Sequence, residues 1–192
     1  MQILDRIIGV SNNVLDSIDT SYIDVHQDKL MNFELNHNPY YFHLESGKEH
    51  YRLLIYISTL YNNEVIFDVG TNKCMSALAL SYNKSNKIKS FDIVKLLPEN
   101  PLVDNIEYII GDSTKDTDLN NCSIIFLDVD HDGSYENIFY DYLKSINWKG
   151  ILILDDIHLN QPMKEFWNKI SEEKYDITNI GHWSGTGLVL FK

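Results

Sequence analysis

Carboxylates follow two long apolar runs in the second half of the chain. Asp128 comes directly after residues 124–127, and the pair Asp155-Asp156 comes after residues 151–154. Unbroken apolar runs of this kind are typical of parallel strands that are buried on both faces. If the two strands are neighbours, about 4.8 Å apart, the three carboxylates converge at one edge of a sheet. Carboxylates that close raise one another's pKa values, so a converging set usually indicates a bound cation.

Oxygen ligands alone favour Mg²⁺, Mn²⁺ or Ca²⁺ over Zn²⁺. A divalent cation beside a hydroxyl group lowers the pKa of that hydroxyl, and a nearby Asp or His can then remove the proton. Asp130 is the first choice for this base, with His131 and His158 behind it. The sequence leaves open the alternative that the carboxylates only end strands and cap helices.

Residues 64–80 predict a strand, a tight turn and a buried helix. The apolar run 65–67 ends in Asp68-Val69-Gly70, and the helix is expected to begin at Met75. Such a unit places backbone N–H groups beside the carboxyl end of a parallel strand, where a carboxylate or phosphate can bind. The dinucleotide fingerprint G-x-G-x-x-G and the P-loop lysine are both missing here, so neither NAD nor ATP is the natural first choice.

This turn resembles the first motif of class I S-adenosylmethionine-dependent methyltransferases, acidic-x-Gly-x-x-x-Gly-x-Ser. Asp68, Gly70 and Ser76 match the motif, whereas Cys74 stands at the position of its second glycine. Asp92 falls 22 residues after Gly70, at the distance where an acidic side chain binds ribose hydroxyls. The resemblance implies a cofactor site made of Asp68, Gly70, Thr71, Asn72, Ser76, Asp92, Ile93, Asp112, Ser113 and Asp128.

Within this family, the chain is similar to the divalent-metal-dependent O-methyltransferases that act on catechols or on sugar hydroxyls. The similarity implies that Asp128, Asp155 and Asp156 bind the cation, most naturally Mg²⁺, and that Asp130 is the general base of the sugar-modifying members. The Asp130 position favours a glycan or sugar-bearing acceptor over a catechol. The inserted Asp132-Gly133 departs from the commoner Asp-His-Ser-Tyr-Glu sequence and leaves the direction of His131 open.

The resemblance covers residues 46–192 and implies an α/β, Rossmann-like fold with a seven-stranded, mostly parallel sheet and helices on both faces. A C-terminal antiparallel hairpin, from residues 175–183 and 187–191, is expected to complete the sheet. Residues 1–45 predict a small helical extension, with short helices near 3–8, 14–18 and 30–35. Helices are also expected from residue 46 towards 60, at 135–146 with Ile138 on the inner face, and from Asn160 onwards.

Composition excludes several other classes of protein. With 16 Lys and Arg against 28 Asp and Glu, the net charge is −12, which disfavours nucleic acid as a partner. Two cysteines without metal-ligand spacing indicate reduced core residues. No basic start with a long apolar stretch and no run of eighteen apolar residues is present. We therefore expect a cytoplasmic protein without a membrane partner; a homodimer is left open.

Two other functions compete with methyl transfer. Residues 126–130 resemble the Asp-x-Asp motif of haloacid-dehalogenase-like phosphatases, but that motif normally opens its sheet rather than following three strands. Alternatively, Cys74 narrows the cofactor pocket and leaves a binding or scaffolding protein. The sequence also does not decide whether residues 182–187 and the aromatic cluster 40–43 face a substrate, or whether His50 and Tyr51 close over the cofactor.

Overall fold

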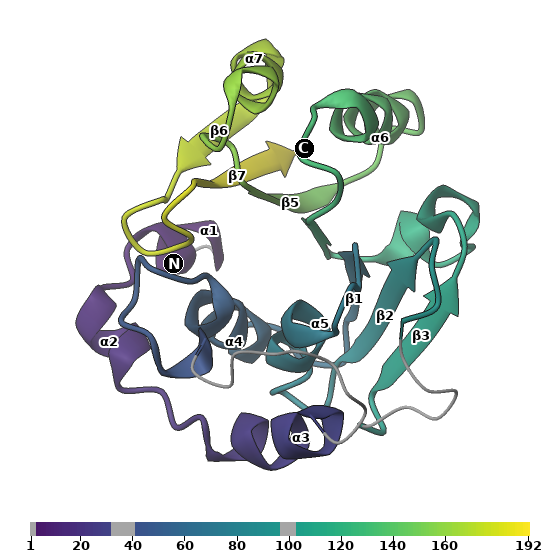
Figure 1. Ribbon diagram of the computed structural model, residues 1–192. Helices are drawn as coiled ribbons and strands as arrows, with labels where there is room; N and C mark the ends of the chain where they lie inside the picture. Colours follow the sequence, from purple (N-terminus) through teal and green to yellow (C-terminus); the bar gives the residue numbers. More distant parts are fainter. Residues whose placement is uncertain (1–2, 32–40, 97–102) are drawn as a thin grey trace.

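The computed structural model of the protein describes residues 3–31, 41–96 and 103–192. Within these residues, one seven-stranded sheet has the order β3-β2-β1-β4-β5-β7-β6 (Figure 1). Neighbours among β1 to β5 are parallel, whereas β7 is antiparallel to both β5 and β6. The predicted Rossmann-like sheet with its antiparallel end is thus confirmed. The strands are β1 (Val65–Val69), β2 (Lys87–Asp92), β3 (Ile106–Ile110), β4 (Ile124–Leu127), β5 (Gly150–Asp155), β6 (Glu173–Asp176) and β7 (Thr186–Phe191).

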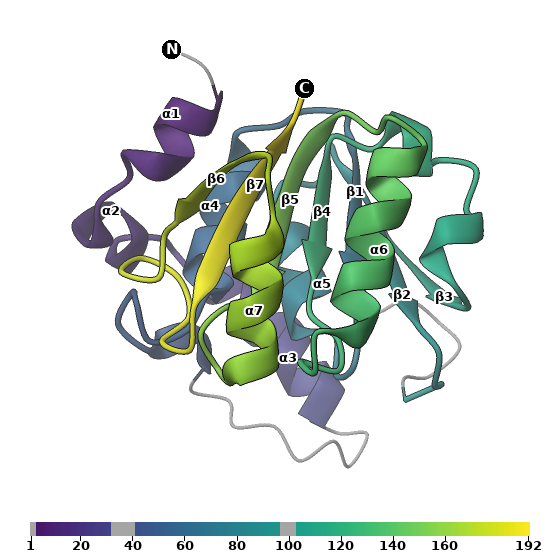
Figure 2. The same cartoon turned by 90° about the horizontal axis from the view of Figure 1, so that it is seen from above.

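Helices cover both faces of the sheet, as Figures 1 and 2 show. Successive strand residues point to opposite faces, so Ile66 belongs to one buried cluster and Phe67 to the other. The first face is covered by α4 (Tyr51–Thr59) and α5 (Met75–Leu80), and the second by α6 (Ser134–Ser145) and α7 (Gln161–Lys169). The β-strands are therefore held rigidly between two apolar layers, with their carboxyl ends at one edge.

The N-terminal segment folds onto the layer that contains α4. It forms α1 (Ile3–Ile8), α2 (Asn12–Asp16) and α3 (Ser21–Met31), followed by the 3₁₀ turn η1 (Tyr41–His43). The buried side chains of Ile7, Leu15 and Phe42 lie in the same apolar cluster as α4 and α5. Arg52 in α4 donates hydrogen bonds to the carbonyl oxygens of Phe42 (3.0 Å), Leu15 (3.2 Å) and Asp16 (2.7 Å). The extension is helical, as predicted, and it shares the core of the rest of the chain.

Several boundaries differ from the predictions. Strand β6 ends at Asp176 rather than at residue 183, because the Asp176 carboxylate accepts the backbone N–H of Thr178 and Gly181 N–H bonds to Ile177 O. The helix expected from residue 46 begins at Tyr51. In α6 the side chain of Ile138 is 64% exposed rather than buried. The helix predicted at 30–35 is α3, which begins at Ser21, and residues 32–35 lie outside the described part.

No helix in the described part of the chain is both long enough and apolar enough to cross a membrane.

Candidate functional site

A cavity of about 240 Å³ lies at the carboxyl ends of β1, β2 and β4. The strand order turns from β2-β1 to β4-β5 at this place, and ligands of open α/β sheets bind at such a crevice. We call it the larger cavity. Its lining consists of Val69, Gly70, Asn72, Phe91, Asp92, Ile93, Gly111, Ser113, Asp128, Val129, Asp130, His131 and Tyr135.

Gly70 lets the turn after β1 approach the end of β4. Its φ angle is +103°, and a Cβ atom at this position would lie 1.6 Å from the backbone oxygen of Asp128. Any other residue would clash with main-chain atoms that have no room to shift. The N–H groups of Gly70 and Thr71 both donate to the carbonyl oxygen of Phe91, at 2.9 Å. The glycine is thus required by the geometry that opens the larger cavity.

Asp92 ends β2 beside this turn. Its Oδ2 accepts the backbone N–H of Asn72 at 2.8 Å, and its Oδ1 accepts that of Val94 at 3.0 Å. Ile93 is 79% exposed and lines the larger cavity. The structure thus places both residues that the resemblance assigned to the cofactor, Asp92 and Ile93, at the larger cavity.

Cys74 does not fill the larger cavity. Its backbone is left-handed, with φ of +72°, which is the conformation that glycine adopts most easily. Its Sγ atom lies 2.6 Å from the hydroxyl oxygen of Tyr108 in β3, and burial raises the pKa of the thiol to about 12. Cys74 lines neither the larger cavity nor the smaller one described below. The steric objection to a ligand in this turn is therefore removed.

Two predicted cofactor residues turn their carboxylates elsewhere. Asp68 has no exposed surface; its Oδ2 accepts a hydrogen bond from Ser90 Oγ at 2.6 Å, and burial raises its pKa to about 6. The Asp112 carboxylate accepts the N–H and the hydroxyl of Thr114 at the start of a 3₁₀ turn. Neither residue lines the cavities, whereas Ser113 does. Asp68 acts instead through Ser90, whose hydroxyl lies 2.6 Å from that of Thr71 in the turn.

A smaller cavity of about 190 Å³ adjoins the larger one. The two share Gly70, Asn72 and Asp128 in their linings. Tyr41 lines this smaller cavity, whereas Phe42 from the same aromatic cluster is buried in the core. The lining consists of Tyr41, Tyr51, Gly70, Thr71, Asn72, Lys73, Met75, Ser76 and Asp128.

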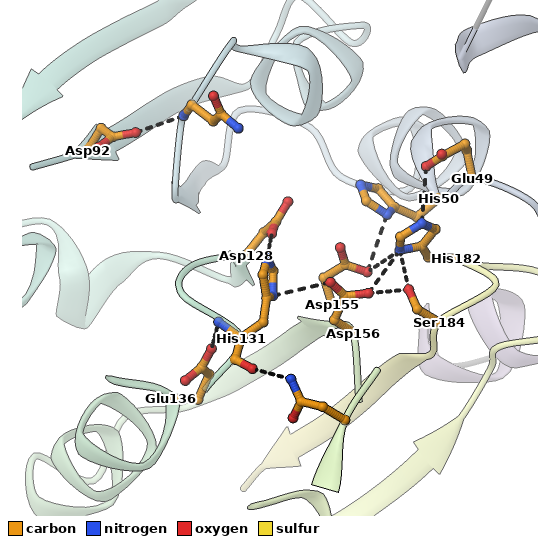
Figure 3. Close-up of polar contacts among 12 residues, drawn as sticks. Glu49, His50, Asp92, Asp128, His131, Glu136, Asp155, Asp156, His182 and Ser184 are labelled. Atoms are coloured by element: carbon orange, nitrogen blue, oxygen red, sulfur yellow. Dashed lines mark hydrogen bonds and ion pairs between the residues drawn. The ribbon is translucent and has the colours of Figure 1, made fainter. Parts of the chain in front are cut away.

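The three predicted metal ligands lie at one edge of the sheet, together with histidines (Figure 3). His131 joins two of them, with Nε2 3.3 Å from Asp128 Oδ1 and Nδ1 3.3 Å from Asp156 Oδ2. His182 Nδ1 lies 3.1 Å from Asp155 Oδ1 and 3.3 Å from Asp156 Oδ1. The hydroxyl of Ser184 donates to Asp156 Oδ1. We call Asp128, Asp155 and Asp156 the acidic cluster. Loop 182–187 therefore contacts the acidic cluster through His182 and Ser184.

Among the described residues, three groups place possible metal-ligand atoms within 4.8 Å of one another. Each contains at least one histidine, and the all-carboxylate set of Asp128, Asp155 and Asp156 is not among them. Sequence reasoning did not assign Glu49, His50 and His182 to the metal site. The three groups are Glu49 with His50 and His182, His50 with Asp128 and Asp155, and Asp155 with Asp156 and His182.

The carboxylates of the cluster differ in charge preference. Burial raises the pKa of Asp128 well above its usual value, and the neighbouring Asp155 adds to this effect. Burial acts on Asp155 in the same direction, but His50 and His182 outweigh it and hold its pKa well below the usual range. Burial alone would lower the pKa of His182, but hydrogen bonds with Asp155 and Asp156 raise it to about 10.

The three candidate bases occupy different places. Asp130 is exposed and lines the larger cavity, and His131 lines it as well. His158 lines neither cavity, because its Nε2 lies 2.6 Å from Asp176 Oδ2 at the end of β6. The structure thus brings Asp130 and His131 to the cavity and places His158 apart from it.

Backbone strain is concentrated around the site. Asn72, Cys74, His131 and Asp156 all have positive φ angles, between +40° and +72°. Such left-handed residues are uncommon outside glycine and cluster at functional sites. Two side chains hold the His131 backbone: Glu136 Oε1 accepts its N–H at 3.0 Å, and Asn160 Nδ2 donates to its carbonyl oxygen at 2.7 Å.

No family model matches the sequence, and no curated protein matches it either. Solved structures do match, at low identity. A methyltransferase from Geobacter sulfurreducens has a TM-score of 0.57 and 14% identity, with 100% of both chains covered. The SAH-bound methyltransferase PaMTH1 from Podospora anserina has a TM-score of 0.54 and 13% identity, with 88% of both chains covered. A Staphylococcus aureus protein provisionally described as a caffeoyl-CoA O-methyltransferase has a TM-score of 0.56 and 14% identity. The match covers 88% of this chain and 97% of the Staphylococcus chain.

Identities this low establish the fold rather than the reaction. The protein therefore has the fold of the class I S-adenosylmethionine-dependent methyltransferases.

Proposed function

We propose that this protein is an S-adenosylmethionine-dependent O-methyltransferase that methylates a hydroxyl group of a small molecule or sugar with the help of a divalent cation. The observation that supports this most strongly is the meeting of two features at Asp128. This residue lines the larger cavity, beside the turn after β1, and it also belongs to the acidic cluster. A methyl donor in the cavity would thus lie next to groups that can activate an acceptor oxygen.

The cofactor half of the site rests on Asp92, Ile93 and Gly70. Each carboxylate oxygen of Asp92 accepts one backbone N–H and keeps further acceptor capacity for the ribose hydroxyls. The exposed Ile93 side chain offers an apolar surface to the adenine ring. Gly70 leaves the main chain open to the methionine part. SAH bound in the Podospora structure supports this choice of cofactor.

In methyl transfer, the acceptor oxygen forms a bond with the methyl carbon while the S–C bond breaks and its electron pair stays on sulfur. The hydroxyl proton must go to a base, and we assign this role to Asp130, which is exposed in the larger cavity. His131 is the second candidate for the base, and it also orients Asp128 and Asp156. His158, paired with Asp176, would act only if the acceptor extended beyond the cavity.

The acidic cluster fits a divalent cation. Asp128 is half-buried beside Asp155, and desolvation together with that neighbour disfavours its charged form. A cation would remove this penalty. A cation held by Asp128 and Asp155, which belong to one group of possible ligand atoms within 4.8 Å of one another, would lower the pKa of the acceptor hydroxyl and fix its oxygen. Mg²⁺ is the cation that oxygen ligands favour.

The charge of the molecule narrows the class of acceptor. A net charge of −12 and carboxylates at the cavity repel phosphorylated or otherwise anionic molecules. A neutral, hydroxyl-rich molecule such as a sugar or glycan is therefore our first choice, and a catechol is the second.

A methyl-transfer assay tests the proposal. The protein is incubated with S-adenosylmethionine and neutral sugar-bearing metabolites or catechols, with Mg²⁺ or with a chelator. We expect a methyl ether that disappears on chelation, and a rate that falls by about 10²–10⁴ in Asp130→Asn. Transfer that survives chelation would contradict the role of the cation. SAH binding without transfer to any acceptor would favour a cofactor-binding scaffold.

A further inference from the structure

His50 is a buried imidazole without a hydrogen-bond partner. Its side chain is only 3% exposed, and neither ring nitrogen makes a hydrogen bond within the residues that the structure describes. The nearest polar group is Asp155, whose Oδ1 lies 3.4 Å from His50 Nδ1. Leaving a buried polar group unsatisfied costs about 1–3 kcal/mol. A bound ligand that contacts the ring nitrogens of His50 would remove this cost.

Aromatic neighbours fix the direction of the ring. The His50 ring centre lies 4.6 Å from that of Tyr51, 5.0 Å from that of Phe126 and 5.3 Å from that of His182. Figure 3 shows the imidazole directed from the start of α4 towards Asp155. Because these rings pack around it, His50 cannot turn its nitrogens to solvent. It remains aimed at the acidic cluster.

The other members of the cluster are already engaged. Asp156 accepts a hydrogen bond from Ser184 at one oxygen and faces His131 at the other, 3.3 Å away. His182 Nδ1 lies within hydrogen-bond distance of Asp155 (3.1 Å) and of Ser184 (2.8 Å). Among the described residues, by contrast, His50 Nε2 makes no hydrogen bond or ion pair, and Nδ1 has only the 3.4 Å contact with Asp155. It also forms a group with Asp128 and Asp155 in which the ligand atoms lie within 4.8 Å.

We propose that the cation centre is a mixed nitrogen–oxygen site in which His50, rather than Asp156, is the third protein ligand beside Asp128 and Asp155. One imidazole with two carboxylates suits a divalent transition metal such as Mn²⁺, Fe²⁺ or Co²⁺, because Mg²⁺ takes oxygen ligands almost exclusively. Asp156 then holds His131 and His182 in place. The proposal deepens the cation-assisted transfer proposed above, but the site can be tested without cofactor or acceptor.

The test is Mn²⁺ binding by the metal-free full-length protein, measured by pulsed electron paramagnetic resonance, which detects a nitrogen nucleus coordinated to the metal. We expect nitrogen coupling in the wild-type protein, and Mn²⁺ that stays bound in about a tenfold excess of Mg²⁺. The coupling should be lost in His50→Gln and kept in His182→Gln. His43→Gln, which changes an exposed imidazole paired with Asp24, is the matched control.

Three results would overturn the proposal. They are wild-type protein that binds no Mn²⁺, Mn²⁺ bound without nitrogen coupling, and coupling that is lost in His182→Gln but kept in His50→Gln. The wild-type spectrum decides between an oxygen-only and a mixed site even if His50→Gln does not fold. Failure of the proposed methyl transfer can be distinguished from failure of the metal-site proposal. Nitrogen-coordinated Mn²⁺ in a protein that binds no SAH would support the metal site and contradict the methyl transfer.

Discussion

At the scale of single residues, Asp68 shows how the fold sets the charge of a motif side chain. It is fully buried at the end of β1, and one of its oxygens, Oδ1, has no hydrogen-bond partner in the described residues. Burial raises its pKa from 3.8 to about 6, against the hydrogen bond from Ser90. Between these two pH values the folded state holds a proton that the unfolded chain has lost, so stability falls as the pH rises through this window.

The side chain in Asp68→Asn cannot titrate, so the stability of this variant does not fall with rising pH through deprotonation at position 68. We expect the stability of Asp68→Asn relative to the wild type to rise by about 1–3 kcal/mol between pH 4 and pH 7. Urea unfolding at both pH values measures the difference. Glu45→Gln, at an exposed carboxylate, serves as the control and should show no such change. A difference between Asp68→Asn and the wild type that stays constant with pH would contradict the assignment.

Single residues also show what the sequence could and could not predict about the site. Asp92 and Asp155 end their strands and Asp128 and Asp156 follow theirs, so the register of a parallel sheet brings all four to one edge, as predicted. Asp68 lies within β1 and Asp112 comes two residues after β3, yet local hydrogen bonds turn their carboxylates away from the cavities. The direction of a side chain depends on such contacts, which the order of motifs does not contain.

At the scale of elements, the start of α7 connects a helix to the candidate site. Asn160 caps this helix, since its Oδ1 accepts the N–H of Met163 at 3.0 Å. The same side chain donates to the carbonyl oxygen of His131, in the strained loop after β4. One residue therefore stabilises α7 and fixes the loop that positions His131.

We expect Asn160→Ala to lower the free energy of unfolding by about 1–3 kcal/mol, because a helix cap and a second hydrogen bond are lost together. Gln161→Ala is the neighbouring control; it removes only an exposed contact with Glu165 and should change stability by less than about 0.5 kcal/mol. Denaturant unfolding of both variants decides the matter. Equal stabilities would mean that Asn160 does not act as a cap in solution.

Elements with a strong pattern were predicted well, and those without one were not. The apolar runs of β4 and β5 and the periodic side chains of α6 and α7 indicated their positions closely. Strand β6 was placed too late because residues 177–183 look apolar and β-prone, whereas the Asp176 side chain starts a turn there. Helix α3 has only a weak apolar face, so its start at Ser21 left no clear signal in the sequence.

At the scale of the whole molecule, the N-terminal helices and the sheet share one apolar core. Arg52 links α4 to the end of α2 and to η1 through three carbonyl oxygens, and Tyr41 of η1 reaches the smaller cavity. We expect Arg52→Met, which keeps an apolar stem but no donors, to cost about 1–3 kcal/mol. Trypsin should then cleave faster within residues 1–45.

Limited proteolysis followed by mass spectrometry measures this effect, with Lys48→Met, at an exposed position outside the extension, as the control that keeps both trypsin sites of residues 1–45, Arg6 and Lys29. Cleavage that is unchanged in Arg52→Met would show that the extension docks by apolar contacts alone.

The meeting of distant segments is what the sequence could least predict. Glu49 and His50 precede the first strand, and His182 lies in the final loop, yet they converge with Asp155 at the end of β5. Their convergence depends on α4 packing on one face of the sheet and on β7 pairing antiparallel with β5. No local pattern at residues 49, 50 or 182 shows that these side chains share one site.

The most direct test of the central claim is calorimetric titration of the purified protein with SAH, for the wild type, Asp92→Ala and Asp141→Asn. Asp141 is an exposed carboxylate on α6 that pairs with Lys169, so its variant is the control. We predict binding in the micromolar range for the wild type and the control, and a loss of at least about 100-fold in Asp92→Ala. No binding by the wild type, or equal affinity in Asp92→Ala, would contradict the proposed cofactor site.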